Sequence, residues 1–402
     1  MEGINIKTLL LLSTIFLFGC TSKHKIDTGE EGVIKVDMSE KEKYLKMSEI
    51  VDSIQYIHLS TSSENLIGNV SKLIPFEDKI MIVDNVNAQS IFLFTDKGEY
   101  ISQIGSRGAG PEEYVSIESV TVDTKGKRIF IYDSKQRKIL TYSFQNVFIE
   151  SFSPDFFLRE IEYVGNNVLA CYCDFYSGDE TLLKNKEVPL VVLYNLNNKA
   201  TKGFCYESMA ITTTETIHPY QTLARYSNTN ATFYYPLSEY IYDVDNQNVR
   251  GVLKVIFSEE NEKLRTTYLQ RLRDEIITPE QLMPGGNARD MFYQLSGVMR
   301  GDNFIFIGYL NRETAVNGVG LYYLKNRKFI NGHSDKKYPI RNDIDGGYPL
   351  IPDAIMNDKI YTVIDADYLE QLNTTSAVLK IFQQTLTSDD NPVIMISTIN
   401  IK

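Results

Sequence analysis

The chain has 402 residues and a formal net charge of −11 at pH 7, with 26 tyrosines, 20 phenylalanines and no tryptophan. This acidic charge argues against a nucleic-acid partner, because phosphates require clustered lysine and arginine, and against a basic patch as the means of membrane attachment. Tyrosine and phenylalanine favour the half-buried surfaces of β-strands, so the composition favours a β-rich fold.

The N-terminus has the pattern of a secretory signal peptide over residues 1–19. Lys7 precedes an apolar run at residues 9–18, which is followed by the small residue Gly19. A basic start, a short apolar core and a small residue at the cleavage point are typical of such peptides. The run has about ten residues, whereas a membrane-spanning helix needs roughly 20.

The cleavage point itself, Leu17-Phe18-Gly19-Cys20, resembles the lipobox of bacterial lipoproteins. The resemblance implies that Cys20 becomes the lipidated first residue of the mature chain; the alternative is an ordinary signal peptide followed by a chance cysteine. Residues 20–32 are polar and predict a flexible tether to the membrane. Residues 21–25 lack the acidic run that resembles a surface-export signal, so a periplasm-facing position is favoured over a surface-exposed one.

Alternating apolar residues recur at a regular spacing along the rest of the chain. Residues 79–84, 90–94 and 99–104 predict three strands joined by short turns, and residues 128–152 repeat the pattern about 48 residues later. Weaker units follow at residues 167–206, 232–257, 302–324 and from 358 onward. A period of 40 to 50 residues with several strands per unit is typical of propeller blades.

The count of six units predicts an all-β fold, a six-bladed β-propeller over residues 33–402. Radial packing buries the two faces of each small sheet against its neighbours, which no single sheet achieves alone. We expect the strand at residues 52–59 to complete the last blade and so close the ring. The alternatives are seven blades, or five blades with an irregular domain.

Two stretches depart from strand alternation. Residues 258–282 are charged and place Leu264, Tyr268 and Leu272 on one helical face, which predicts a helical insertion between blades four and five. Residues 369–385 predict a second helix before the final strand at 392–396.

The most distinctive motif is the glycine-rich loop at residues 105–114. Its glycines do not follow the order of a dinucleotide fingerprint, and a strand rather than a helix is predicted after it. We therefore expect a turn between blades with positive φ angles at three glycines: Gly105, Gly108 and Gly110. The alternative is a ligand-binding loop that presents three charged side chains at the mouth of the central channel: Arg107, Glu112 and Glu113.

The segment Gly108-Ala109-Gly110-Pro111-Glu112-Glu113-Tyr114 resembles that of the six-bladed, NHL-like propeller lipoproteins of Bacteroidota. Asp52-Ser53-Ile54 before His58-Leu59, and Asn391-Pro392-Val393-Ile394 near the end, fit the same family. The resemblance covers residues 33–402 and implies a six-bladed fold and a cell-envelope location. It implies no settled activity and adds no catalytic residue.

The remaining reactive side chains do not form a recognisable centre. Cys171 and Cys173 lie on one face of a predicted strand and are expected to be small buried residues, with a bridge from Cys205 as the minority alternative. Histidines from separate units are expected to be structural, so we predict no metal site and no cofactor: His58, His218 and His333. Aspartates at recurring strand ends are expected to cap turns: Asp84, Asp133 and Asp243.

Two classes of function follow from these patterns. The first is an envelope lipoprotein whose propeller binds or scaffolds an unknown glycan, peptide or envelope protein. The second is a lyase or hydrolase that acts on an exported glycan or peptide within the channel. The catalytic residues of such an enzyme are unknown, because the chain contains neither a G-x-S-x-G nor an H-E-x-x-H motif.

Overall fold

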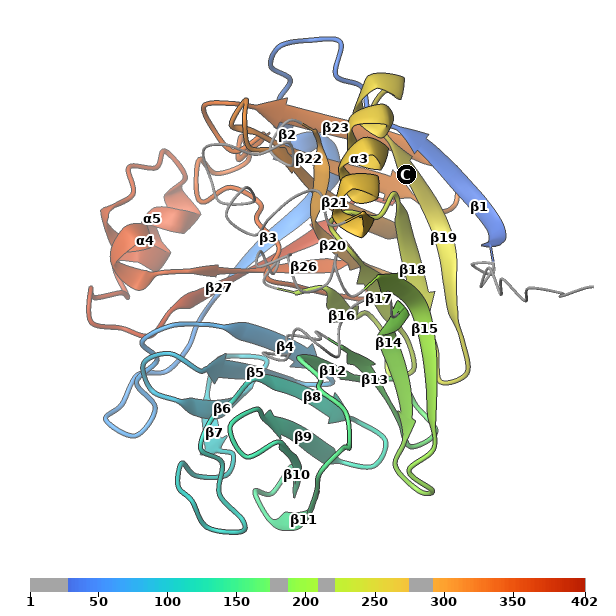
Figure 1. Ribbon diagram of the computed structural model, residues 1–402. Coiled ribbons are helices and arrows are strands. Elements are labelled where there is room, and N and C mark those ends of the chain that lie inside the picture. Colours follow the sequence, from blue (N-terminus) through green and yellow to red (C-terminus); the bar gives the residue numbers. More distant parts are fainter. Residues whose placement is uncertain (1–27, 174–186, 209–220, 275–291, 402) are drawn as a thin grey trace, which may run out of the picture.

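A computed structural model describes residues 28–173, 187–208, 221–274 and 292–401. Six sheets, each with at least four strands, surround a central axis (Figure 1). The first strand of each sheet lies nearest the axis, and the first strands of neighbouring blades contact one another around most of the ring. This arrangement confirms the predicted six-bladed β-propeller.

Blades 1 and 2 follow the sequence repeats. Blade 1 consists of β4 (Lys72–Phe76), β5 (Lys79–Asp84), β6 (Ser90–Thr95) and β7 (Tyr100–Gln103). Blade 2 consists of β8 (Ser119–Asp123), β9 (Arg128–Asp133), β10 (Lys138–Ser143) and β11 (Phe148–Phe152). All residues of β8 are buried while those of β11 are partly or fully exposed, because the inner strand is covered on both faces and the outer strand is not.

Blades 3 and 4 follow blade 2 around the ring, with β12 against β8 and β16 against β12. Blade 3 consists of β12 (Glu160–Tyr163), β13 (Val168–Tyr172), β14 (Glu187–Asn195) and β15 (Thr201–Ser208). Blade 4 consists of β16 (Leu223–Arg225), β17 (Ala231–Tyr234), β18 (Tyr240–Val244) and β19 (Val249–Ile256). A fifth strand, β1 (Thr28–Lys35), pairs in parallel with β19. Residues 28–32 of the predicted tether therefore form part of this strand, with Thr28 opposite Gly251 and Gly32 opposite Leu253.

Blades 5 and 6 complete the ring. Blade 5 consists of β20 (Gln294–Arg300), β21 (Phe304–Asn311), β22 (Val316–Tyr323) and β23 (Lys328–Ser334). Blade 6 consists of β25 (Ala354–Met356), β26 (Lys359–Ile364), β27 (Val393–Ile399) and β3 (Val51–His58). Between β1 and β3 the chain forms β2 (Leu45–Lys46), which pairs with β24 (Ile340–Arg341), and the short helix α1 (Met47–Ile50).

The closure of the ring joins the two ends of the chain, as predicted. β3 pairs in antiparallel register with β27, so a strand from the N-terminal part is the outermost strand of the last blade. Asn391 is buried and ties this junction together: its side chain donates to the carbonyl oxygens of Ser60 and Asn65 and accepts from the amide of Ile67.

Besides α1, three helices lie between strands in the described part of the chain. α3 (Glu259–Arg273) lies between β19 and β20, in the interval predicted to be helical; residues 275–282 of that prediction lie outside the described residues. The single helix predicted over 369–385 is instead two, α4 (Ala366–Gln371) and α5 (Ala377–Gln383). The side chain of Gln383 donates to the carbonyl oxygens of Leu369 and Leu372, which stabilises the break. Within the described ranges, no helix is both long and apolar enough to span a membrane.

The hydrophobic core is divided among the interfaces between blades. One cluster joins Leu93 of blade 1 to Val122 of blade 2, and another joins Phe130 of blade 2 to Leu169 of blade 3. Cys171 and Cys173 are buried in the second cluster, and neither they nor the partly buried Cys205 form a disulfide among the described residues. The cysteines therefore act as small core residues, as expected.

The antiparallel order of the strands gives the propeller two different faces. Among the described residues, connections from the fourth strand of a blade to the next blade, and from its second to its third strand, lie on the same face, which we call the loop face. Residues 59–71, 104–118, 257–274 and 365–392 belong to connections of this kind. The opposite face, the turn face, carries short connections such as residues 77–78, 96–99 and 124–127. The three helices α3, α4 and α5 all belong to connections on the loop face.

Candidate functional site

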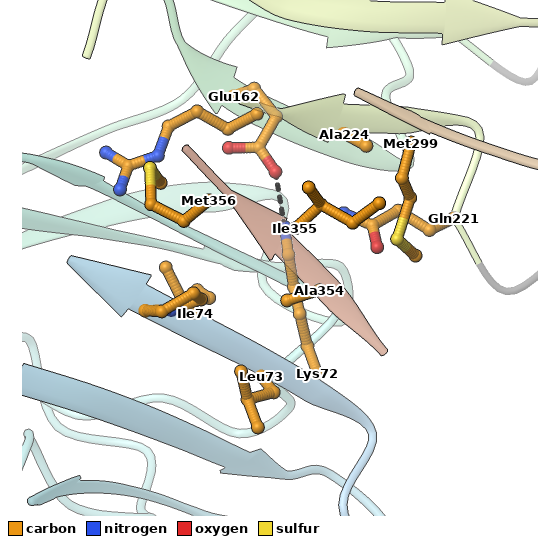
Figure 2. A pocket seen from close by; sticks show the side chains of 12 residues that line it. Lys72, Leu73, Ile74, Glu162, Gln221, Ala224, Met299, Ala354, Ile355 and Met356 are labelled. Atoms are coloured by element: carbon orange, nitrogen blue, oxygen red, sulfur yellow. Dashed lines mark hydrogen bonds and ion pairs between the residues drawn. The ribbon is translucent and has the colours of Figure 1, made fainter. Parts of the chain in front are cut away.

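A small cavity lies at the centre of the ring (Figure 2). Residues in or next to the first strands of blades 1, 3, 4, 5 and 6 line the cavity. Three of them are charged: Lys72, Glu162 and Arg225. The space left free is about 20 Å³, close to the minimum that one water molecule requires. The inner strands therefore nearly close the channel at this level.

Lys72 of β4 and Glu162 of β12 form an ion pair across the channel. The Lys72 Nζ lies 2.6 Å from the Glu162 Oε1 and also donates to the carbonyl oxygen of Val120 at 3.0 Å (Figure 2). The hydroxyl of Thr121 donates to the other carboxylate oxygen at 2.7 Å. Only 3% of the Glu162 side chain is exposed. Both oxygens of this carboxylate are thus engaged, and the contacts connect blades 1, 2 and 3.

Arg225 of β16 extends to the same region from blade 4. Its Nη1 donates to the carbonyl oxygen of Val122 at 2.9 Å, while its Nη2 has no hydrogen-bond partner among the described residues. Burial lowers the pKa of this guanidinium, and the nearby charges of Glu162 and Asp123 oppose that effect. An arginine remains charged under such conditions, so Arg225 adds a second cation beside Lys72.

Glu160 lies two residues before Glu162 on the same strand. Burial raises the pKa of its carboxyl group, and hydrogen bonds from Thr222 and Leu223 partly oppose this rise. A carboxyl group with a raised pKa is typical of a general acid. Here, however, both oxygens accept hydrogen bonds from the start of β16, including one from the Thr222 hydroxyl at 2.6 Å. The contacts of Glu160 therefore hold blade 3 against blade 4.

Asp353 is a titratable group that the sequence analysis missed. It precedes β25, and burial raises its pKa to about 6, although one carboxylate oxygen accepts a hydrogen bond from the Val363 amide at 2.7 Å. The signal in the sequence was an aspartate directly before the apolar pair Ala354-Ile355. Nearby Tyr338 and Tyr348 have pKa values that burial raises and the Asp353 charge raises further.

The arrangement of the channel limits the chemistry available there. Across residues 28–173, 187–208, 221–274 and 292–401, no group of three histidine, cysteine, aspartate or glutamate side chains is close enough together to hold a metal ion. The charged side chains of the channel bond to one another and to backbone groups. In the described part of the chain, the channel therefore connects blades rather than presenting an unengaged acid, base or nucleophile.

The glycine-rich loop lies away from this channel. Gly105 has the predicted positive φ of 64°, but Gly108 and Gly110 do not, so the prediction is wrong for these two. A Cβ at Gly108 would meet the Glu113 carboxylate, so Glu113 would have to move and give up the hydrogen bond that it accepts from the Gly110 amide at 2.8 Å.

Contacts place this loop over the third strand of blade 2. The Tyr142 hydroxyl of β10 donates to the carbonyl oxygen of Glu112, and the Lys138 side chain donates to that of Pro111 at 3.3 Å. Arg107 and Glu112 are exposed and Glu113 is half-buried. None of the three lines the channel. Their role in ligand binding stays a prediction, at a position on blade 2 rather than at the channel mouth.

The recurring aspartates divide into two kinds. Asp84 accepts hydrogen bonds from the amides of Gly68, Asn69, Val86 and Asn87, and Asp133 accepts from those of Val115 and Gln136. This confirms that Asp84 and Asp133 cap turns. Asp243 does not act as a cap: it accepts a hydrogen bond from the Tyr226 hydroxyl at 2.5 Å and lies 3.4 Å from Arg300.

The two described histidines, His58 and His333, lie in different blades. His58 approaches Asp390, with 3.6 Å between Nε2 and Oδ1, at the junction of β3 and β27. His333 is buried in blade 5 and its Nε2 lies 2.7 Å from the carbonyl oxygen of Glu40. His218 lies outside the described residues. The two described histidines therefore contact strand junctions, as expected of structural residues.

Comparison with known proteins assigns the chain to a family. A family model described as "Domain of unknown function (DUF4934)" matches residues 31–398. The chain belongs to the DUF4934 family. No curated protein matches it.

Two solved structures are similar to this DUF4934 propeller to different degrees. One, from Bacteroides fragilis and provisionally described as an exported protein, is 17% identical with a TM-score of 0.65, covering 92% of this chain and 99% of that chain. The other, a member of the DUF4221 family from Bacteroides vulgatus, is 8% identical with a TM-score of 0.48, covering 90% of this chain and 99% of that chain. At 17% identity, the similarity to the Bacteroides fragilis structure supports the fold and no shared function.

Exposed apolar side chains of the DUF4934 propeller are concentrated on the loop face. In the described residues, twelve large apolar side chains are exposed. Seven of them lie in loop-face connections: Leu66, Val86, Phe157, Ile344, Tyr368, Val378 and Ile381. Four lie on outer strands, namely Val33, Ile101, Ile149 and Tyr206, and one, Val147, lies in a turn on the turn face. Exposed apolar clusters mark interaction sites more often than scattered single residues do.

Proposed function

We propose that this DUF4934 protein is an exported, lipid-anchored propeller of the cell envelope that binds a partner through its loop face. The distribution of exposed apolar side chains is the observation that carries this proposal. The loop face holds seven of the twelve in the described residues, and the turn face holds one. The paired charges of the channel add support, because they leave little room for a substrate.

The N-terminal sequence and the similarity to another propeller support the proposed location in the cell envelope. The signal peptide pattern ends at Cys20, and the lipobox-like motif implies a lipid on that cysteine. The related fold from Bacteroides fragilis is provisionally described as exported. The resemblance to NHL-like lipoproteins supports the same location. The acidic chain would then attach by its lipid, with the propeller facing the periplasm.

A lyase or hydrolase acting in the channel has weaker support. Such an enzyme needs an acid, a base or a nucleophile that can reach the substrate. Glu160 and Glu162 are the acidic residues of the channel region, and both accept several hydrogen bonds from neighbouring blades. Either carboxylate could act on a substrate only by giving up these hydrogen bonds, which would weaken the contacts between blades.

The proposal can be tested by photo-crosslinking in cells that carry out lipid modification. A photo-reactive amino acid would replace one exposed residue at a time: Leu66 or Phe157 on the loop face, and Val147 on the turn face. We expect discrete crosslinked products from the loop face and none from the turn face. Products from Val147 alone, or none from any position, would contradict the proposal.

A further inference from the structure

The connection between β26 and β27 carries an apolar surface that the fold itself does not use. α5 buries Leu379, but Val378 is 77% exposed and Ile381 is 66% exposed. These two side chains are three residues apart, so they lie on the same side of the helix. Tyr368 of α4 is 45% exposed and Ile344 of the preceding connection is 43% exposed. We call these four residues the α4–α5 surface.

The segments that carry this surface are held to one another by specific contacts. The Thr374 side chain, between the two helices, donates to the carbonyl oxygen of Asp345 at 2.5 Å. The rings of Tyr348 and Tyr368 meet edge to face with centroids 5.2 Å apart. Tyr56 of β3 donates to the Asp345 carboxylate at 2.8 Å and packs against Phe382 of α5. The surface is thus preformed, which lowers the entropic cost of binding.

The connection that carries α4 and α5 is acidic. Residues 365–391 contain a single basic residue, Lys380, and five acidic ones: Asp365, Asp367, Glu370, Asp389 and Asp390. A segment with exposed apolar side chains and a net negative charge is complementary to an apolar segment flanked by lysine or arginine. The same charge disfavours an anionic bilayer, which attracts basic surfaces.

The position of the chain's N-terminal end also separates this surface from the membrane. β1 begins at Thr28 on the outer edge of blade 4, on the side of the ring opposite α4 and α5 (Figure 1). Eight residues from Cys20 to Thr28 reach at most about 29 Å. A compact chain of this length has a radius of gyration of about 21 Å, and so a width of about 50 Å. A lipid on Cys20 therefore leaves the α4–α5 surface directed away from the bilayer.

We propose that the α4–α5 surface binds a basic, amphipathic segment of a partner protein in the cell envelope. This inference rests on the proposed function and specifies which part of the loop face makes the contact. Ile381 and Val378 insert into the apolar side of the segment. The acidic side chains of the same connection pair with the basic residues of the partner and set its orientation.

The test uses the full-length lipidated chain with a photo-reactive amino acid in place of Ile381. The matched control carries it in place of Ile149, an isoleucine that is 49% exposed on the outer strand of blade 2. The proposal predicts a product from position 381 that joins a different protein, through a peptide containing lysine or arginine beside apolar residues. We expect no such product from position 149.

Substitutions then test the contact itself. With the photo-reactive residue at 381, Val378→Ser is expected to lower the yield at least fivefold, and Glu370→Lys at least threefold. Val147→Ser, at a valine that is 59% exposed on the turn face, should leave the yield unchanged.

Other products would overturn the inference. An adduct with lipid would show that the surface meets the membrane, and a product joining two copies of this chain would show self-association. Products from Leu66 or Phe157 without any from position 381 would refute this inference while leaving the proposed function intact. The absence of products from every loop-face position would refute both.

Discussion

The ion pair between Lys72 and Glu162 gives a quantitative test of the closed channel. Glu162→Leu removes the carboxylate that lies 2.6 Å from the Lys72 Nζ and 2.7 Å from the Thr121 hydroxyl. The Lys72 side chain is only 17% exposed and keeps one acceptor, the carbonyl oxygen of Val120. The substitution also removes one of the two carboxylates, Glu162 and Asp123, whose charges act on Arg225.

The cost of this substitution follows from the burial of the pair. Removing one partner of a buried ion pair costs about 3–5 kcal/mol, because the other charge stays buried. The lower end of this range, about 3 kcal/mol, applies here since Lys72 keeps slight exposure and one acceptor. Replacing both residues, as in Lys72→Met with Glu162→Leu, is expected to cost about 1 kcal/mol or less. The coupling energy between the two positions is therefore about 2 kcal/mol or more.

Urea unfolding of the wild type, both single variants and the double variant measures this coupling. With a slope of about 3 kcal/mol/M, Glu162→Leu lowers the unfolding midpoint by about 1 M. The double variant should unfold close to the wild type. A coupling energy below about 0.5 kcal/mol would refute the reasoning, because it is the value expected of a solvated surface pair.

Three further predictions concern separate parts of the molecule. Burial raises the pKa of Asp353 to about 6, above its unfolded value of about 3.9, so the wild type should lose up to about 3 kcal/mol of stability as the pH rises from 4 to 7. Asp353→Asn should remove this loss, as urea midpoints at both pH values will show; an unchanged pH dependence would contradict it. Gly108→Ala should lower the melting temperature because the added methyl group collides with Glu113. Adding Glu113→Ala should restore part of the loss. If the effects of the two substitutions on the melting temperature simply add, the collision is not the cause. Cys20→Ala should release the protein from membranes in fractionation, and unchanged membrane association would rule out the lipid anchor.

The propeller could be predicted because its information is local and repeated. Alternation in residues 79–84 and 128–133 recurs with aspartates at matching strand ends, Asp84 and Asp133, and both cap turns in the structure. The closing strand was also predictable, because residues 52–59 show strand alternation and precede the first full unit. Both signals depend on residue pattern alone, which a single sequence provides.

Features that depend on distant contacts were not predictable. Glu162 lies 90 residues from Lys72, and Arg225 lies 103 residues from its acceptor Val122, so no spacing rule connects them. Residues 28–32 of β1 were assigned to the tether because their polar character gave no sign of parallel pairing with β19. The glycine-rich loop was predicted to need positive φ angles, but at Gly108 the constraint is the approach of the Glu113 side chain.

The central claim is that the loop face, and not the channel, recognises the partner. It is tested most directly by photo-crosslinking from Leu66 in the double variant that replaces Lys72 by Met and Glu162 by Leu. This variant changes the channel and leaves the loop face as it is. If the loop face recognises the partner, the crosslinking yield of this variant stays within twofold of the wild type. Loss of the crosslinked product in a variant that remains folded would contradict the account and show that the partner is bound through the channel.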